Sequence, residues 1–153
     1  MARQLVRSMT MLMLVIAIAL VSAVASAYGQ SNSPARADIP FAFVAGGETL
    51  DAGRYEVSRN GTGYVKVAGL ENKQSAFSLT MDAIKRAPEK QGKLVFRRYG
   101  SEYFLAEIWT AGETHGRRLM KSKQERAIER ELASIRPNNE SGYERVEIAL
   151  VAQ

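Results

Sequence analysis

The chain contains no cysteine and only one histidine and one tryptophan among its 153 residues. The absence of cysteine excludes disulfides, a cysteine nucleophile and a lipid-anchored cysteine. Because zinc sites draw on several histidine or cysteine ligands, the single His115 does not predict a metal site, and we interpret it as a loop residue. If a chain of this size is exported, the absence of disulfides is more typical of a bacterial periplasmic or secreted protein than of a eukaryotic one.

Familiar catalytic motifs are missing as well. Neither G-x-S-x-G nor S-x-x-K occurs after residue 27. Glu102 and Glu107 fall on one predicted strand at positions of opposite parity, so their carboxylates would face opposite sides and could not share a substrate. The sequence therefore predicts no enzyme, no catalytic residues and no cofactor. Carboxylates that are distant in sequence and meet in one cleft stay open as an alternative.

The N-terminal segment has the three parts of a secretory signal peptide. Two arginines precede a mostly apolar run at residues 9–25, and Ala25 and Ala27 occupy the −3 and −1 positions of a cleavage site before Tyr28. A run of about twenty apolar residues can also span a bilayer as an uncleaved anchor. Its Ala- and Ser-rich end, with no basic cluster directly after it, favours cleavage between Ala27 and Tyr28.

Removal of residues 1–27 leaves a chain with a small excess of positive charge. Lysine and arginine fall from 21 to 21 − 2 = 19 against 16 acidic residues, which leaves a net charge of 19 − 16 = +3. The remaining length suits one domain with one core. We expect the mature chain to be periplasmic or extracellular, not to span the membrane, and not to bind nucleic acid.

Alternating apolar residues predict a single β domain over residues 39–153, preceded by a flexible leader at residues 28–38. The glycine pair at residues 46–47 suits a two-residue hairpin turn that places Phe43 opposite Leu50. A second turn follows at Asn60. There an extra residue near the turn would place Val57 opposite Val65 and keep one face apolar.

The two strongest strand patterns lie in the middle of the chain. Residues 75–83 alternate strictly, and we expect their larger residues to face the core, namely Phe77, Leu79 and Met81. A hairpin turn at Gly100 places Phe96 opposite Leu105 and Tyr99 opposite Glu102. Both faces of this hairpin carry apolar residues, which predicts a central position with a second covering layer.

A helix is predicted over residues 119–135, where Ile128, Leu132 and Ile135 form a narrow apolar stripe that can cover the hairpin. Pro137 ends it, and alternation resumes in the last strand. The fold class is therefore mainly β: an antiparallel β-sandwich or small β-barrel of about seven strands, with one amphipathic helix before the last strand.

Arginines beside aromatic residues are the candidates for contact with a ligand or partner, because such pairs can stack on sugars or bind acidic groups. They are Arg97, Arg98, Tyr99, Tyr103, Trp109, Arg117 and Arg118. Ordinary cross-strand pairing explains them equally well and is the interpretation we prefer. The basic surface of the helix can in principle bind an anionic membrane or partner, but a helix docked on the sheet fits the pattern better.

Three segments carry a resemblance to a known group: "IPFAFVAGGETLDAGRYEV", "LVFRRYGSEYFLAEIWTAG" and "GRRLMKSKQERAIERELA". Together they resemble small exported bacterial proteins of uncharacterised function. In these an IPF-x-F-x-x-G start followed by L-x-A-G-x-Y-x-V is typical, with proline where this chain has Asp51. The resemblance implies export and a compact β domain. It implies no activity, cofactor or catalytic residue.

Three functional hypotheses follow. The leading one is an exported, non-enzymatic β domain that acts as a binding or envelope-associated structural module. The second is a lipocalin-like carrier of a small apolar ligand, and the third is a carboxylate-dependent hydrolase. Partners compatible with these hypotheses are a cell-envelope component, a polysaccharide or a small apolar ligand.

Overall fold

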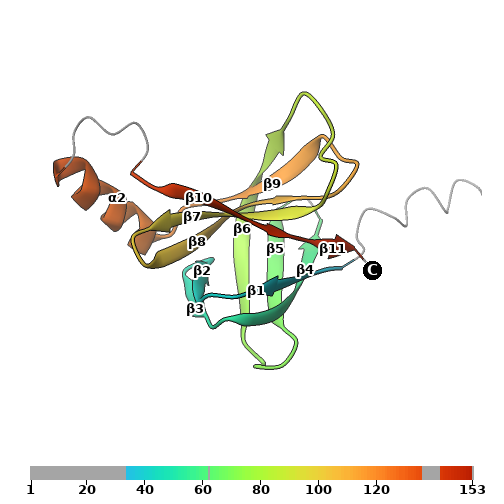
Figure 1. Ribbon diagram of the computed structural model, residues 1–153, viewed down its shortest axis with the longest axis horizontal. Helices are drawn as coiled ribbons and strands as arrows, with labels where there is room; N and C mark the ends of the chain where they lie inside the picture. The colour runs from blue at the N-terminus through green and yellow to red at the C-terminus, as the bar shows by residue number, and fades with distance from the viewer. Residues whose placement is uncertain (1–33, 62, 136–141, 153) are drawn as a thin grey trace, which may run out of the picture. The chain divides into compact units, whose positions relative to one another are not determined.

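Strands make up most of the computed structural model, which describes residues 34–61, 63–135 and 142–152. The described elements, in chain order, are β1 (Ala35–Ile39), β2 (Phe43–Ala45), β3 (Glu48–Leu50), β4 (Gly53–Asn60), β5 (Tyr64–Gly69), β6 (Ser75–Ile84), β7 (Lys93–Tyr99), β8 (Glu102–Trp109), β9 (His115–Leu119), α2 (Lys123–Ile135), β10 (Glu144–Ala149) and β11 (Val151–Ala152) (Figure 1). The predicted signal peptide lies outside the described residues. The prediction of a mainly β fold with one helix ahead of the C-terminal strand is confirmed.

The strands join into one mixed, 11-stranded sheet. Its main order is β10-β7-β8-β9-β6-β5-β4-β1-β11, while β2 pairs with β3 and, in parallel, with β8. The two ends of this order, β10 and β11, are separated in the chain by Leu150 alone, so the sheet curls around its main core. It is not closed into a barrel. Of the two predicted alternatives, the sandwich-like arrangement is the compatible one.

The two hairpins with glycine turns have the predicted registers. Phe43 pairs with Leu50 across the glycine pair at residues 46–47, whose φ angles of 61° and 92° are those that a type I′ turn requires. Phe96 pairs with Leu105 in the hairpin of β7 and β8. Short turns of defined type therefore fix these two registers.

The turn after β4 differs from the prediction. Val57 pairs with Val67 rather than with Val65, and Asn60 pairs with Tyr64, so the register is shifted by two residues. A shift of two preserves the alternation of side chains, and all three valines are still buried in the core. The predicted apolar face is thus correct although the predicted partners are wrong.

The domain begins earlier than predicted. β1 starts at Ala35, inside the segment 28–38 that was predicted to be a flexible leader. Ala37 and Ile39 point into the core, and the strand pairs with β4 along its whole length. Residues 35–38 are therefore part of the sheet.

The helix begins later than the predicted residue 119, because residues 115–119 form β9 and pair with β6 and β8. His115 thus starts a strand instead of lying in a loop. The first turn of α2 is capped by Ser122, whose Oγ accepts a hydrogen bond of 3.1 Å from the backbone N–H of Glu125. This cap explains why the helix starts at Lys123.

The hairpin of β7 and β8 is covered on both faces, as predicted. On the outer side, α2 packs Ile128 and Leu132 against buried residues of β2, β7 and β8. Ile135, the third residue of the predicted apolar stripe, is 66% exposed and takes no part in this contact. The main core lies on the inner side, and its largest fully buried side chains are Tyr55, Phe43, Phe96, Ile39, Leu50 and Leu94.

Candidate functional site

A row of apolar side chains on β6 is turned to solvent. Phe77, Leu79 and Met81 lie on the sheet face opposite the main core and are 56%, 66% and 54% exposed. Two further exposed residues adjoin them: Tyr64 on β5 pairs with Leu79, and Met120, directly after β9, donates its N–H to the Leu79 carbonyl. We call these five residues the apolar strip.

The prediction that this row faces the core is wrong. The small residues Ala76 and Ser78 point inward instead, and Ala76 pairs with Val67 in the core. The reason is space, because the hairpin of β2 and β3 fills the interior beside β6. Its turn lies so close to the backbone that a Cβ on Gly46 would be 2.0 Å from the Phe77 carbonyl oxygen. Large side chains that pointed inward from β6 would meet this hairpin.

Positively charged side chains border the strip on both sides. Lys66, on β5 opposite Phe77, holds its Nζ 5.7 Å from the centre of the Phe77 ring. Arg118, on β9 opposite Met81, donates from Nε to Glu107 over 3.2 Å. The strip is therefore an apolar surface between two cations, which suits a partner that is apolar at its centre and anionic at its border.

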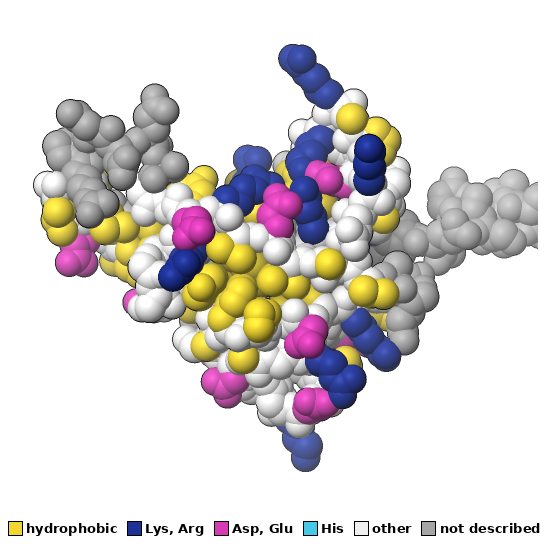
Figure 2. Space-filling view, viewed as in Figure 1, with side chains coloured by type: hydrophobic (Ala, Val, Ile, Leu, Met, Phe, Trp, Pro, Cys, Tyr) yellow, Lys and Arg dark blue, Asp and Glu magenta, His cyan; other side chains and the backbone are white. Residues whose placement is uncertain are grey.

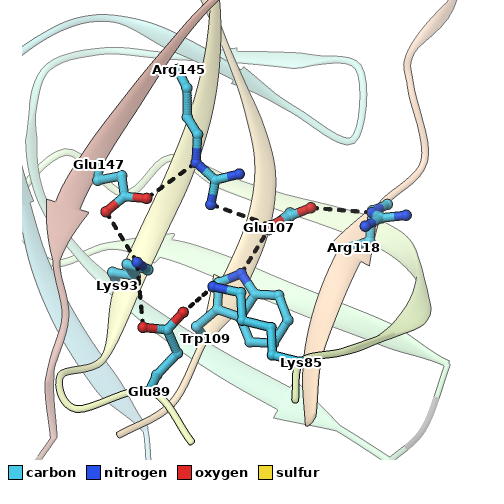
Figure 3. A network of polar contacts seen from close by, with 8 residues as sticks. All are labelled: Lys85, Glu89, Lys93, Glu107, Trp109, Arg118, Arg145 and Glu147. Carbon is cyan, nitrogen blue, oxygen red and sulfur yellow. Dashed lines mark hydrogen bonds and ion pairs between the residues drawn. The ribbon is translucent and has the colours of Figure 1, made fainter. Parts of the chain in front are cut away.

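Arg118 connects the strip to a network of charged side chains on the outer face of the sheet (Figure 3). Glu107 accepts a hydrogen bond of 2.9 Å from Trp109 Nε1 and lies 3.7 Å from Arg145. Burial alone would raise the pKa of Glu107, but these donors and cations together lower it below its ordinary value. The Trp109 ring lies directly on Gly116, where a Cβ would be 2.6 Å from the indole.

The other half of the network covers the Trp109 ring (Figure 3). Lys85 holds its Nζ 4.0 Å from the ring centre and is paired with Glu89. Glu89 also lies 3.3 Å from Lys93, which in turn lies 3.1 Å from Glu147. Burial, with the neighbouring Lys93, lowers the pKa of Lys85. Each carboxylate of the network contacts two cations, and with four cations against three carboxylates the network keeps a net charge of 4 − 3 = +1 at the edge of the strip.

The seven predicted contact residues lie in four separate places. Trp109 and Arg118 belong to the network, Arg97 and Tyr99 lie under α2, Arg98 and Tyr103 stack together, and Arg117 pairs with Asp82. The structure thus brings six of these residues together in three pairs, leaves Arg117 apart from them, and does not gather the seven into one site.

Arg97 and Tyr99 hold α2 on the sheet. Arg97 binds both carboxylate oxygens of Glu125, with 3.1 Å between Nη2 and Oε2. The Tyr99 hydroxyl donates to Glu129 over 2.9 Å and lies 3.2 Å from Glu125. Burial and the bond to Glu129 raise the pKa of Tyr99. The two carboxylates converge on the Tyr99 hydroxyl, and Glu125 is only 2% exposed.

Arg98 and Tyr103 are engaged in packing. The Arg98 guanidinium lies 5.4 Å from the centre of the Tyr103 ring, and this ring stacks on Phe41 with 3.9 Å between the centroids. Arg98 also pairs with Glu144 over 3.1 Å. Both predicted residues are therefore occupied by contacts within the chain. Figure 2 shows the face that includes β1, β2 and β8, with hydrophobic side chains gathered in its middle.

Within the described ranges, no group of three or more His, Asp or Glu side chains could hold a metal ion. No family model, curated protein or solved structure matches the chain. The candidate site is therefore defined by geometry, and the apolar strip is its centre. The sequence did not reveal this surface, because apolar and polar residues alternate in the same way whether the apolar side of a strand faces solvent or the core.

Proposed function

We propose that the mature protein is an exported, non-enzymatic β domain that associates with the cell envelope by placing the apolar strip on an anionic lipid surface. The observation that carries the proposal is the exposure of Phe77, Leu79 and Met81 in one row. Exposed contiguous apolar surfaces are typical of interaction sites. β6 pairs with β5 over residues 75–79 and with β9 over residues 80–84, so the feature that the whole strip shares is its outward-facing apolar side chains.

A second copy of the chain fits the strip poorly because both borders are cationic. Face-to-face pairing about a twofold axis would bring Lys66 and Arg118 of one copy close to the same two cations of the other. Like charges that face each other oppose association. An anionic surface would instead be attracted by both borders.

A lipid surface satisfies both parts of the strip. The apolar side chains would leave water at the boundary between headgroups and acyl chains, while Lys66 and Arg118 would stay at the depth of the phosphates. Each such cation near an anionic leaflet contributes about 1 kcal/mol. The signal peptide pattern of residues 1–27 supports delivery of the chain to the envelope. Among the described residues, none of the helices has the length and apolar character needed to cross a membrane.

The test compares two serine substitutions in a chain of residues 28–153. Leu79 and Ile135 are each 66% exposed, so Leu79→Ser and Ile135→Ser remove similar apolar surface, one inside the strip and one outside it. Burial of the exposed part of a leucine is worth roughly 1–2 kcal/mol, or roughly 5–30-fold in partitioning. We expect Leu79→Ser to weaken binding by this factor and Ile135→Ser to leave it unchanged. Binding is measured by sedimentation with phosphatidylglycerol–phosphatidylcholine vesicles.

Three results would contradict the proposal. The first is equal loss of binding in the two variants, and the second is equal binding of the wild type to vesicles of phosphatidylcholine alone. The third comes from sedimentation velocity in the absence of vesicles. A concentration-dependent dimer that disappears in Leu79→Ser would assign the strip to self-association instead of lipid.

A further inference from the structure

The helix α2 has a second face that the sheet does not use. Ile128 and Leu132 face the sheet, whereas Lys123, Arg126 and Arg130 share the opposite side of the helix, where all three are exposed. No acidic residue separates the three cations on this side. The outward face of α2 is therefore a short row of positive charge.

These cations differ from most others in the domain. Within the described residues, Lys123, Arg126 and Arg130 have no carboxylate partner, and the only side-chain bond among them runs from Arg130 Nε to the Arg126 carbonyl. By contrast, Lys121, just before the helix, is paired with Glu129. The charge of the row is thus free to act on a ligand.

An open hollow in the surface lies beside the row. The described residues that line it are Lys123, Arg126, Glu129, Arg130 and Ala133. Glu129, the one acidic residue among these described residues, is already bound to Lys121 and Tyr99 and so does not cancel the charge of the row.

We propose that this face of α2 binds a soluble polymer that carries phosphate groups along its chain. Arginine binds phosphate through two parallel N–H donors, so Arg126 and Arg130 can each hold one phosphate group. At about 1.5 Å of rise per residue, Arg126 and Arg130 are spaced about 6 Å apart and the row extends about 10 Å. Three exposed cations over this length suit successive charges of one chain better than a single anion.

The row is separate from the apolar strip. α2 lies at one end of the domain, where it packs on the end of the hairpin of β7 and β8, whereas β6 crosses the middle (Figure 1). Loss of polymer binding and loss of lipid binding can therefore be told apart, because Leu79→Ser changes only the strip and substitutions at Arg126 and Arg130 change only the row.

The experiment titrates the chain of residues 28–153 with sodium polyphosphate and measures affinity by calorimetry at several salt concentrations. Arg126→Gln/Arg130→Gln removes two cations of the row and keeps good helix formers. Its matched control is Arg86→Gln/Lys90→Gln, which removes two exposed cations elsewhere that also have no carboxylate partner in the described part of the chain. We expect the helix variant to bind roughly 10–30-fold more weakly and the control to bind like the wild type.

The salt dependence gives a second readout. Each charge neutralised on a single-stranded polyanion contributes about 0.7 to the slope of log affinity against log salt, so the helix variant should lose about 1.4 of the slope. Equal weakening in both double variants would overturn the proposal, since the effect would then follow net charge alone. Binding that single inorganic phosphate reproduces at equal phosphate concentration, or that only phosphatidylglycerol vesicles support, would overturn it as well.

Discussion

Replacement of Phe96 by alanine should destabilise the domain far more than replacement of Phe77, because the two rings lie on opposite faces of the sheet. Phe96 is 0% exposed, and its ring meets Phe43 and Phe41 edge-to-face at centroid distances of 5.4 Å and 5.2 Å. Phe77 is 56% exposed, and its nearest ring, that of Tyr64, is 6.4 Å away.

The burial of each ring determines how much free energy of unfolding is lost when it is replaced by alanine. A fully buried phenylalanine costs about 3–5 kcal/mol when it is cut back to alanine, and two edge-to-face contacts place Phe96 in the upper half of that range. Phe77 has less than half of its surface buried, so its transfer contribution is roughly 1 kcal/mol and its loss should cost about 0.5–1 kcal/mol. The expected difference between the two variants is therefore about 3 kcal/mol or more.

Urea unfolding measures this difference. Trp109 is the only tryptophan and is 2% exposed, so its fluorescence reports loss of the packed state. With a typical slope of about 2 kcal/mol per molar urea, Phe96→Ala should lower the midpoint by about 2 M and Phe77→Ala by less than about 0.5 M. Equal losses would refute the outward orientation of Phe77 and, with it, the apolar strip.

Two further predictions concern charged side chains. Glu125→Ala leaves the Arg97 guanidinium buried without its carboxylate and should cost about 3–5 kcal/mol in urea unfolding, whereas Glu125→Leu combined with Arg97→Met should recover most of that loss. Burial would raise the pKa of Glu107, but the hydrogen bond from Trp109 and the nearby cations lower it. The ionised Glu107 carboxylate therefore stabilises the fold fully above its unfolded pKa of about 4.3. This stabilisation is lost as the pH falls through the lower folded pKa. The difference in stability between wild type and Glu107→Gln should therefore shrink over that range; a constant difference from about pH 6 to pH 3 would contradict it.

Turn chemistry is the part of the fold that the sequence encodes most directly. The glycines at residues 46–47 and at Gly100 adopt positive φ, and a two-residue loop determines which residues face each other across it. The pairing of Phe96 with Leu105 could therefore be derived before the structure was known. The longer connection across residues 61–63 admits several registers. The sequence could therefore predict which residues of the two strands share a face, but not which residues pair.

The boundary between β9 and α2 shows a different limit. Ser122 and Glu125 form a local signal for a helix start, but helical periodicity alone extended the helix back to residue 119. The sequence of β9 is largely polar and does not alternate like a strand. It becomes a strand because β6 and β8 offer hydrogen-bond partners on both sides, and that information is absent from residues 115–119 themselves.

The orientation of β6 could not be decided locally, because alternation shows which residues share a face but not which face is inside. That choice depends on the hairpin of β2 and β3, which fills the interior beside β6. This hairpin lies about thirty residues before β6 in the chain. An apolar row that stays in water adds little to folding, so the free energy of removing its surface from water, roughly 25 cal/mol per Å², remains available to a bound partner. Leu79→Ser separates the two roles. It should weaken lipid binding while the urea midpoint hardly moves, and a parallel loss of both would place the row in the core and remove the basis for a binding surface.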